Sequence, residues 1–191
     1  PLLETYLASL YLQKGDLEKA AVSCEKALSV DPESIGLMML TAGVYSSLKR
    51  QDEAIRLYEK VLKSDPGQNE AYIFLGTIYI QEGRANEAED LFQKLSRIKD
   101  HESLGYYYLG RVYASQKDFA RAKRHFEKSI RVDPDFMQAY LSLGILYEIE
   151  KKPDKAIQIY KKALKINPHQ TQIQQRLSML RSVWFTPTLA Q

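Results

Sequence analysis

Histidine, cysteine and the short glycine or serine motifs of enzymes are the features of this chain that could carry out catalysis or hold a metal. The three histidines are His101, His125 and His169, and none of them stands at a metal-ligand spacing from the single cysteine, Cys24. The sequence contains no glycine-rich phosphate loop, no G-x-S-x-G and no H-E-x-x-H. It therefore predicts a chain that is not an enzyme, with no catalytic residue, no metal site and no cofactor.

The chain is built from a sequence pattern that recurs every 34 residues. The recurring residues are Tyr11, Tyr45, Tyr79, Tyr113 and Tyr147; Ala20, Ala54, Ala88, Ala122 and Ala156; and Pro32, Pro66, Pro134 and Pro168. Positions 4, 7, 8 and 11 of the repeat, which are mostly apolar, share one helical face, and positions 20, 24 and 27 share another, so each repeat is expected to form two helices. Asp52 is an expected N-cap, and the second helices are expected to end just before the prolines.

This pattern resembles the tetratricopeptide repeat (TPR), a helix-turn-helix unit. The resemblance implies an all-α fold, a right-handed superhelical solenoid of TPR units with the first helices on the concave wall. The expected organisation is a single TPR domain over residues 1–183, with repeats 1–34, 35–68, 69–102, 103–136 and 137–170, a capping helix 171–183, and a tail or linker 184–191. The third repeat has Asp100 where proline is expected, which suggests a locally adapted turn or, as a second hypothesis, a hinge.

Cys24 occupies the position where the other repeats carry an aromatic residue. A buried packing thiol is therefore expected rather than a reactive one. A single cysteine also excludes an intramolecular disulfide.

In the TPR family, first-helix positions 2, 5, 6, 9, 12 and 13 line the concave groove. Reading these positions here gives an apolar and aromatic set: Tyr6, Met39, Leu40, Ile73, Phe74, Thr77, Tyr107, Tyr108, Arg111 and Leu141. Such a groove suits an amphipathic helix or an extended apolar segment, with Arg111 available to a carboxylate. The alternative is that these rings only pack between neighbouring repeats. Thr5, Ser9, Met39 and Leu40 stand where chaperone-binding TPR domains carry lysine and asparagine, so binding of an Asp-terminated chaperone tail is not expected.

Charge is divided unevenly along the chain. Residues 1–102 carry 12 Lys and Arg against 17 Asp and Glu, whereas residues 103–191 carry 15 against 7. Three uses remain open: self-association through ends of opposite charge, docking of the basic end on an acidic partner, or a solvated outer face. Nucleic-acid binding is not expected, because no aromatic platform is interleaved with the basic residues.

The cellular compartment of the protein and the role of its C-terminal tail are not determined by the sequence. There is no apolar run of about 18 residues, so no membrane span is expected. The start at Pro1 shows no signal peptide and suggests a fragment or processed chain, so a cytoplasmic or periplasmic location is open. The tail, with Trp184, Phe185 and Pro187, is a linker, a remnant, or a segment that inserts into a neighbouring molecule's groove.

Taken together, the residues predict a non-catalytic scaffold that recruits a partner protein or peptide. Resemblance to bacterial multi-repeat proteins makes assembly of an envelope or secretion complex one such role. The alternatives are an accessory, substrate-presenting domain of a larger enzyme, such as a glycosyltransferase or peptidase, and a structural protein that self-associates.

Overall fold

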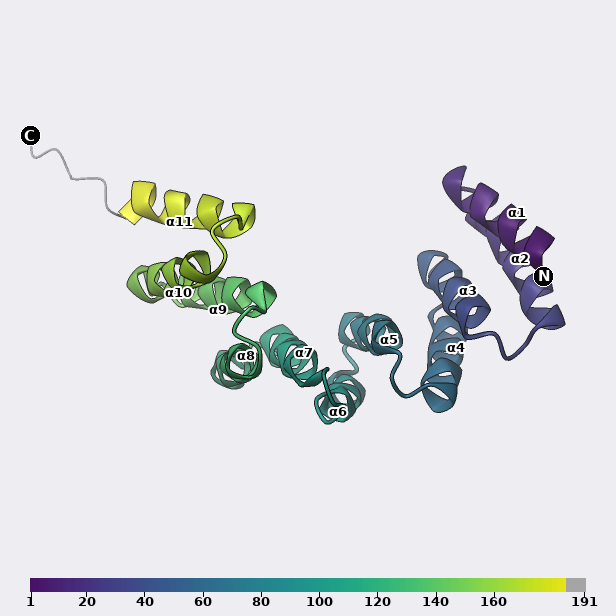
Figure 1. The fold of residues 1–191 in the computed structure, drawn as a ribbon, viewed down its shortest axis with the longest axis horizontal. Coiled ribbons are helices and arrows are strands. Elements are labelled where there is room, and N and C mark those ends of the chain that lie inside the picture. Colours follow the sequence, from purple (N-terminus) through teal and green to yellow (C-terminus); the bar gives the residue numbers. More distant parts are fainter. Residues whose placement is uncertain (185–191) are drawn as a thin grey trace, which may run out of the picture. The chain divides into compact units, whose positions relative to one another are not determined.

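The computed structural model describes residues 1–184, with side chains as far as residue 182. Within these residues the chain forms eleven α-helices and no strand (Figure 1). They are α1 (Leu2–Gln13), α2 (Leu17–Val30), α3 (Ile35–Ser47), α4 (Gln51–Ser64), α5 (Asn69–Gln81), α6 (Ala85–Leu95), α7 (Glu102–Ser115), α8 (Phe119–Val132), α9 (Met137–Ile149), α10 (Pro153–Ile166) and α11 (Thr171–Trp184). The predicted all-α solenoid of helix-turn-helix repeats is confirmed. The hypotheses about the Trp184-Phe185 tail fall outside the described residues.

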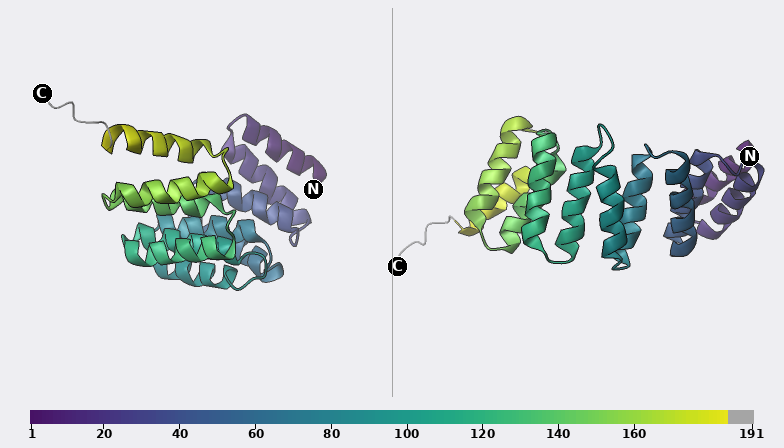
Figure 2. Two further views of the ribbon diagram at one scale, coloured as in Figure 1. Left: turned by 60° about the vertical axis from the view of Figure 1, so that its left-hand side comes forward. Right: turned by 90° about the horizontal axis from the view of Figure 1, so that it is seen from below.

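The helices group into two compact units, unit 1 (residues 1–91) and unit 2 (residues 92–191), with the boundary inside α6. In unit 1, α1 pairs with α2 and α3 with α4, while α2 packs on α3 and α4 on α5. In unit 2, α7 pairs with α8 and α9 with α10, while α8 packs on α9 and α10 on α11 (Figure 2). Within each unit, the helix pairs thus bury their apolar faces against one another, as a repeat array requires.

In the two repeats of unit 2, a glycine on the first helix faces a large aromatic ring on the second helix of the same repeat. In unit 2, a Cβ added at Gly110 would lie 2.5 Å from Cε1 of Phe126, and one at Gly144 would overlap the Tyr160 ring. Both rings are almost completely buried. The recurring glycines therefore serve close helix packing.

The second helix of four repeats ends just before the proline of that repeat, as predicted. Their C-cap residues are Asp31, Asp65, Asp133 and Asn167, each followed by the proline of the repeat. This prediction is confirmed, since the residue before proline is disfavoured in helical geometry.

The prediction that Asp52 caps α4 is wrong. The N-cap of α4 is Arg50, and Asp52 lies in the first turn, where its charge still suits the helix dipole. Asp16 and Asp118, which stand 34 residues before and 68 residues after Arg50, do cap α2 and α8 through their side chains. The cap position of the repeat is therefore the one that Arg50 occupies.

The end of the third repeat differs from the others, as its missing proline suggested. Helix α6 has 11 residues, whereas α2, α4, α8 and α10 each have 14. Asp100 in the following turn has a φ of 68°. A Cβ at Gly105 of α7 would lie 2.5 Å from Cα of Ser96, so the start of α7 runs directly against the backbone after α6. This is a locally adapted turn, and the hinge stays a hypothesis.

Candidate partner-binding surface

In unit 1, the predicted groove residues lie on the first helices α1, α3 and α5. Tyr6 is 63% exposed and Phe74 is 48% exposed. The Phe74 ring of α5 stacks on the Tyr58 ring of α4, with 5.8 Å between ring centroids. Half-buried side chains make up the rest of this set, namely Met39, Leu40, Ile73 and Thr77. Unit 1 therefore presents two exposed aromatic rings, of which Phe74 is fixed on one side by packing.

In unit 2, the predicted residues on α7 have different surroundings. Tyr108 is buried, and its ring stacks on Phe92 with 4.8 Å between centroids. Tyr107 is half-buried and contacts the edge of Tyr108 as well as the Phe136 ring. Arg111 is exposed, its guanidinium lies 5.2 Å from the centre of the Tyr108 ring, and it forms no ion pair with any described residue. Of these three, Arg111 is the one open to a partner.

Two hollows flank α9 on the same side as Arg111. The α7–α9 hollow has a volume of about 240 Å³ and is lined by Arg111, Ala114, Phe119, Phe126, Ser142, Ile145, Leu146 and Ile149. The α9–α11 hollow has a volume of about 420 Å³ and is lined by Leu141, Ile145, Gln172, Gln175, Arg176 and Met179. Ile145 lines both, so the hollows adjoin. We call them together the furrow of unit 2.

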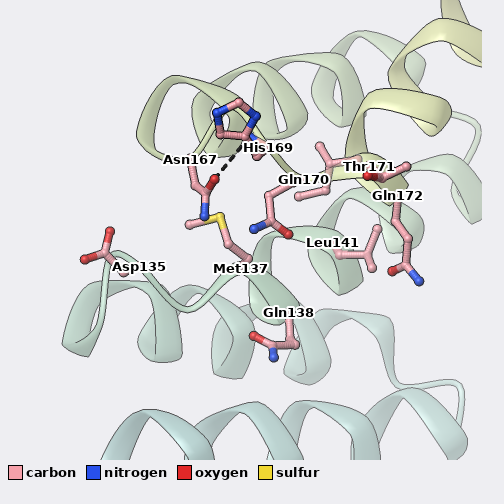
Figure 3. Close-up of a pocket in the computed structure, with 10 residues that line it drawn as sticks. Asp135, Met137, Gln138, Leu141, Asn167, His169, Gln170, Thr171 and Gln172 are labelled. Carbon is pink, nitrogen blue, oxygen red and sulfur yellow. Dashed lines mark hydrogen bonds between the residues drawn. The ribbon is translucent and has the colours of Figure 1, made fainter.

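A third hollow continues the furrow toward the start of α11 (Figure 3). It has a volume of about 570 Å³ and shares Leu141 and Gln172 with the α9–α11 hollow. Figure 3 shows Met137, Gln138 and Leu141 on the α9 side of this hollow and Gln170 on the side of α11. Its walls therefore combine apolar side chains with amides that can donate and accept hydrogen bonds.

A polar cluster fixes α11 beside the furrow. The Glu148 carboxylate accepts a hydrogen bond from the Tyr160 hydroxyl and forms an ion pair with Arg176, with 3.0 Å between Nη1 and Oε2. Burial is the main cause that raises the pKa of Tyr160, and the hydrogen bond to Glu148 raises it further. The Tyr160 hydroxyl therefore stays protonated and remains a donor. Arg176 also lines the α9–α11 hollow. The guanidinium is thus held in place at the edge of the furrow.

The repeat pattern predicted Arg111 and Leu141 of the furrow, and Ser142 and Ile145 stand at two of the same groove positions, 6 and 9. Ile149 is 54% exposed and occupies position 13 of its repeat, one of the positions expected to line a TPR groove, so the family pattern could have identified it. Met179 is 65% exposed on α11, a helix interpreted only as a cap. The capping helix contributes one wall of the furrow as well as closing the core.

The single cysteine, Cys24, lies in the hydrophobic core. Cys24 is fully buried, and burial raises the pKa of its thiol, which confirms the packing role expected of it. Within residues 1–184, no cluster of three or more His, Cys, Asp or Glu side chains could hold a metal ion. None of the helices in the same range is both long and apolar enough to span a bilayer.

Comparison with known proteins agrees with this architecture. A sequence profile described as Tetratricopeptide repeat protein 21 C-terminal ARM domain matches residues 1–177. The crystal structure of MamA is 28% identical, with a TM-score of 0.66 over 87% of this chain and 97% of that one. PilF of Pseudomonas aeruginosa is 26% identical, with a TM-score of 0.68 over 95% of this chain and 82% of that one. No curated protein sequence matches.

A more distant likeness concerns the fold alone. YrrB, described as a TPR protein with an unusual peptide-binding site, is 21% identical, with a TM-score of 0.57 over 90% of this chain and 89% of that one. Repeat families of this type generally act as non-catalytic scaffolds for protein interaction. The chain belongs to the family of the Tetratricopeptide repeat protein 21 C-terminal ARM domain, and its helix pairs are TPR-like repeats.

Proposed function

We propose that the chain is an interaction scaffold whose unit 2 binds an amphipathic helix or an extended apolar segment of a partner protein in the furrow. The observation that carries this proposal is the adjoining pair of hollows around Ile145, bounded by Arg111 on α7 and Arg176 on α11. A segment that crosses α9 would place successive apolar side chains in the two hollows. Recognition of this kind uses side chains as anchors along a groove.

The size and polarity of the α7–α9 hollow favour a peptide side chain over a drug-sized small molecule. At about 240 Å³, the α7–α9 hollow is smaller than the pockets of about 300–1,000 Å³ that hold drug-sized ligands. Its floor is made of Phe126, Ile145 and Leu146, with one cation, Arg111, at the edge. This arrangement suits one apolar anchor residue next to a carboxylate or a backbone carbonyl.

The exposed rings of unit 1, Tyr6 and Phe74, are proposed as further contacts of a partner, on the strength of their exposure and their first-helix positions. YrrB, which shares the fold, is described as having a peptide-binding site, and this makes a peptide the first ligand to test. The alternatives of a substrate-presenting domain and a self-associating structural protein stay predictions.

A photo-crosslinking experiment tests the furrow. A crosslinking amino acid at Ser142, which lines the α7–α9 hollow, should capture a defined partner in the native cell, whereas the same residue at Arg56, exposed on α4, should not. The captured protein is then purified and its affinity is measured directly.

The affinity measurement uses matched variants. Ile149→Glu places a charge at an exposed edge of the α7–α9 hollow and should weaken binding by about tenfold or more. Val22→Glu makes the same change at an exposed aliphatic residue of α2 and should leave the affinity unchanged. Equal affinities for the two variants, with both proteins folded, would refute the assignment of the furrow.

A further inference from the structure

Unit 2 has a second groove, formed by the second helices α8 and α10 over a floor supplied by α9. Its volume is about 500 Å³. We propose that this outer groove binds an acidic amphipathic segment of a partner protein, with apolar side chains in the groove and carboxylates on its basic rim. This binding surface is separate from the furrow, because the two have no lining residue in common.

The floor and walls of the outer groove are apolar. Tyr140 and Leu143 of α9 form the floor, and both are about 1% exposed. Ile130, Ile159 and Ile166 form the walls, and Ile166 is 39% exposed. The Tyr140 ring is almost completely buried, and its hydroxyl has no hydrogen-bond partner among the described residues. An aliphatic or aromatic side chain of a partner fits this environment.

The rim of the outer groove is basic. Arg131 of α8 and Lys162 of α10 line it, and Glu127 is the one acidic residue among its described lining residues. Neither cation forms an ion pair with any described residue, and Lys162 lies 5.9 Å from the centre of the Tyr140 ring. Arg124 lies seven residues before Arg131 on α8, and Lys165 lies three residues after Lys162 on α10, so each is on the same helical face as the rim cation of its helix. Neither Arg124 nor Lys165 forms an ion pair with a described residue.

The charge of α8 and α10 is specific to this part of the chain. These two helices carry nine Lys and Arg against only Glu127 and Asp154. The corresponding second helices of unit 1, α2 and α4, carry five Lys and Arg against five Asp and Glu, so their net charge is zero. A requirement for solubility alone would act on all four helices. The excess of cations beside an apolar groove therefore favours an acidic partner segment.

Peptide selection on the full chain tests this proposal. A phage library of short random peptides is first depleted on the double variant Arg131→Glu/Lys162→Glu, which keeps the furrow intact, and is then selected on the native chain. Enriched peptides should contain acidic residues next to an aliphatic or aromatic anchor. Their affinity for the native chain is measured by fluorescence anisotropy at low and high salt.

Three variants decide the outcome. Arg131→Glu/Lys162→Glu should reduce the affinity by about tenfold or more, and Ile166→Ser should also reduce it, because the anchor loses a wall of the groove. Arg56→Glu/Lys63→Glu, an equal charge change on exposed residues of α4, should have little effect. The absence of enriched peptides, or enriched peptides that ignore Ile166 and respond only to salt, would overturn the proposal and leave the furrow unaffected.

Discussion

Gly110→Ala is the substitution for which the structure gives the clearest quantitative expectation. The added Cβ would lie 2.5 Å from Cε1 and 2.6 Å from Cδ1 of Phe126. Carbon atoms in contact are normally about 3.5–4.0 Å apart, so the ring or the α7 backbone must move by about 1 Å. Phe126 is 1% exposed and touches the Tyr107 ring on one side, with 5.8 Å between centroids, so it has little room to retreat.

Two free energies of opposite sign compete in this variant. Alanine is a better helix former than glycine by about 0.8–1 kcal/mol. Overpacking a close-packed core typically costs about 1–3 kcal/mol. Because the clash is with a fully buried ring, the cost should exceed the gain, and the free energy of unfolding should fall by about 1–2 kcal/mol.

Gly36→Ala is the matched control. Gly36 lies at the start of α3, is exposed, and a Cβ there would meet nothing within 4 Å. Only the propensity term then acts, so this variant should be as stable as the native chain or more stable by up to about 1 kcal/mol.

Thermal unfolding followed by circular dichroism measures both variants. A change of 1 kcal/mol shifts the melting temperature by about 2–4 °C for a chain of about 150–250 residues, so the two variants should differ measurably. Because Phe126 also lines the α7–α9 hollow, Gly110→Ala should weaken partner binding as well. A Gly110→Ala chain that melts at or above the native temperature would refute the packing argument.

Three further predictions concern single side chains. The buried Cys24 thiol should react with a thiol reagent many times more slowly in the native chain than in urea, and equal rates would contradict its burial. Burial, and to a smaller extent the hydrogen bond to Glu25, raises the pKa of Tyr45 to about 12. The folded chain therefore keeps the Tyr45 proton at a pH near 10, where the unfolded chain loses it. Stability should therefore fall as pH rises from about 10 to about 12, and Tyr45→Phe should reduce that fall in melting experiments. Arg176→Met should remove the ion pair with Glu148 at a cost of at most about 1 kcal/mol, because the pair is partly exposed, yet should speed amide exchange in α11 if the pair fixes that helix.

Most of the fold could be predicted because the core positions of the repeat are constrained by close packing. A ring such as Phe126 requires a small residue opposite, and that demand recurs every 34 residues. The ends of the second helices could also be predicted from the sequence, since proline disfavours helical geometry in the residue that precedes it. The N-cap of α4 was misread because Asp52 is a good capping residue in general, whereas the register of the repeat places Arg50 at the cap.

The surface was harder to predict than the core. A groove position of the TPR pattern specifies where the Cα atom of a residue lies on the helix. How exposed the side chain is depends on the residues of the neighbouring repeat. Tyr108 shares its repeat position with the exposed Tyr6 and Phe74, but besides Phe92 its ring contacts Tyr107 and the Arg111 guanidinium, and it is buried. The wall formed by α11 was missed because the apolar stripe of that helix indicates only which face is buried, and Met179 lies outside it.

The two proposed surfaces of unit 2 meet at one helix, and the periodicity of that helix keeps them apart. Tyr140 and Leu143 of α9 belong to the outer groove, whereas Leu141, Ile145 and Ile149 belong to the furrow. Residues four apart share a helical face, so each set forms its own stripe. On the two proposals together, a partner in one groove leaves the residues of the other uncovered, so a single unit would hold two segments at once. Charge reversal at Arg131 and Lys162 should accordingly weaken the binding of an acidic segment by about tenfold or more while a segment bound in the furrow keeps its affinity.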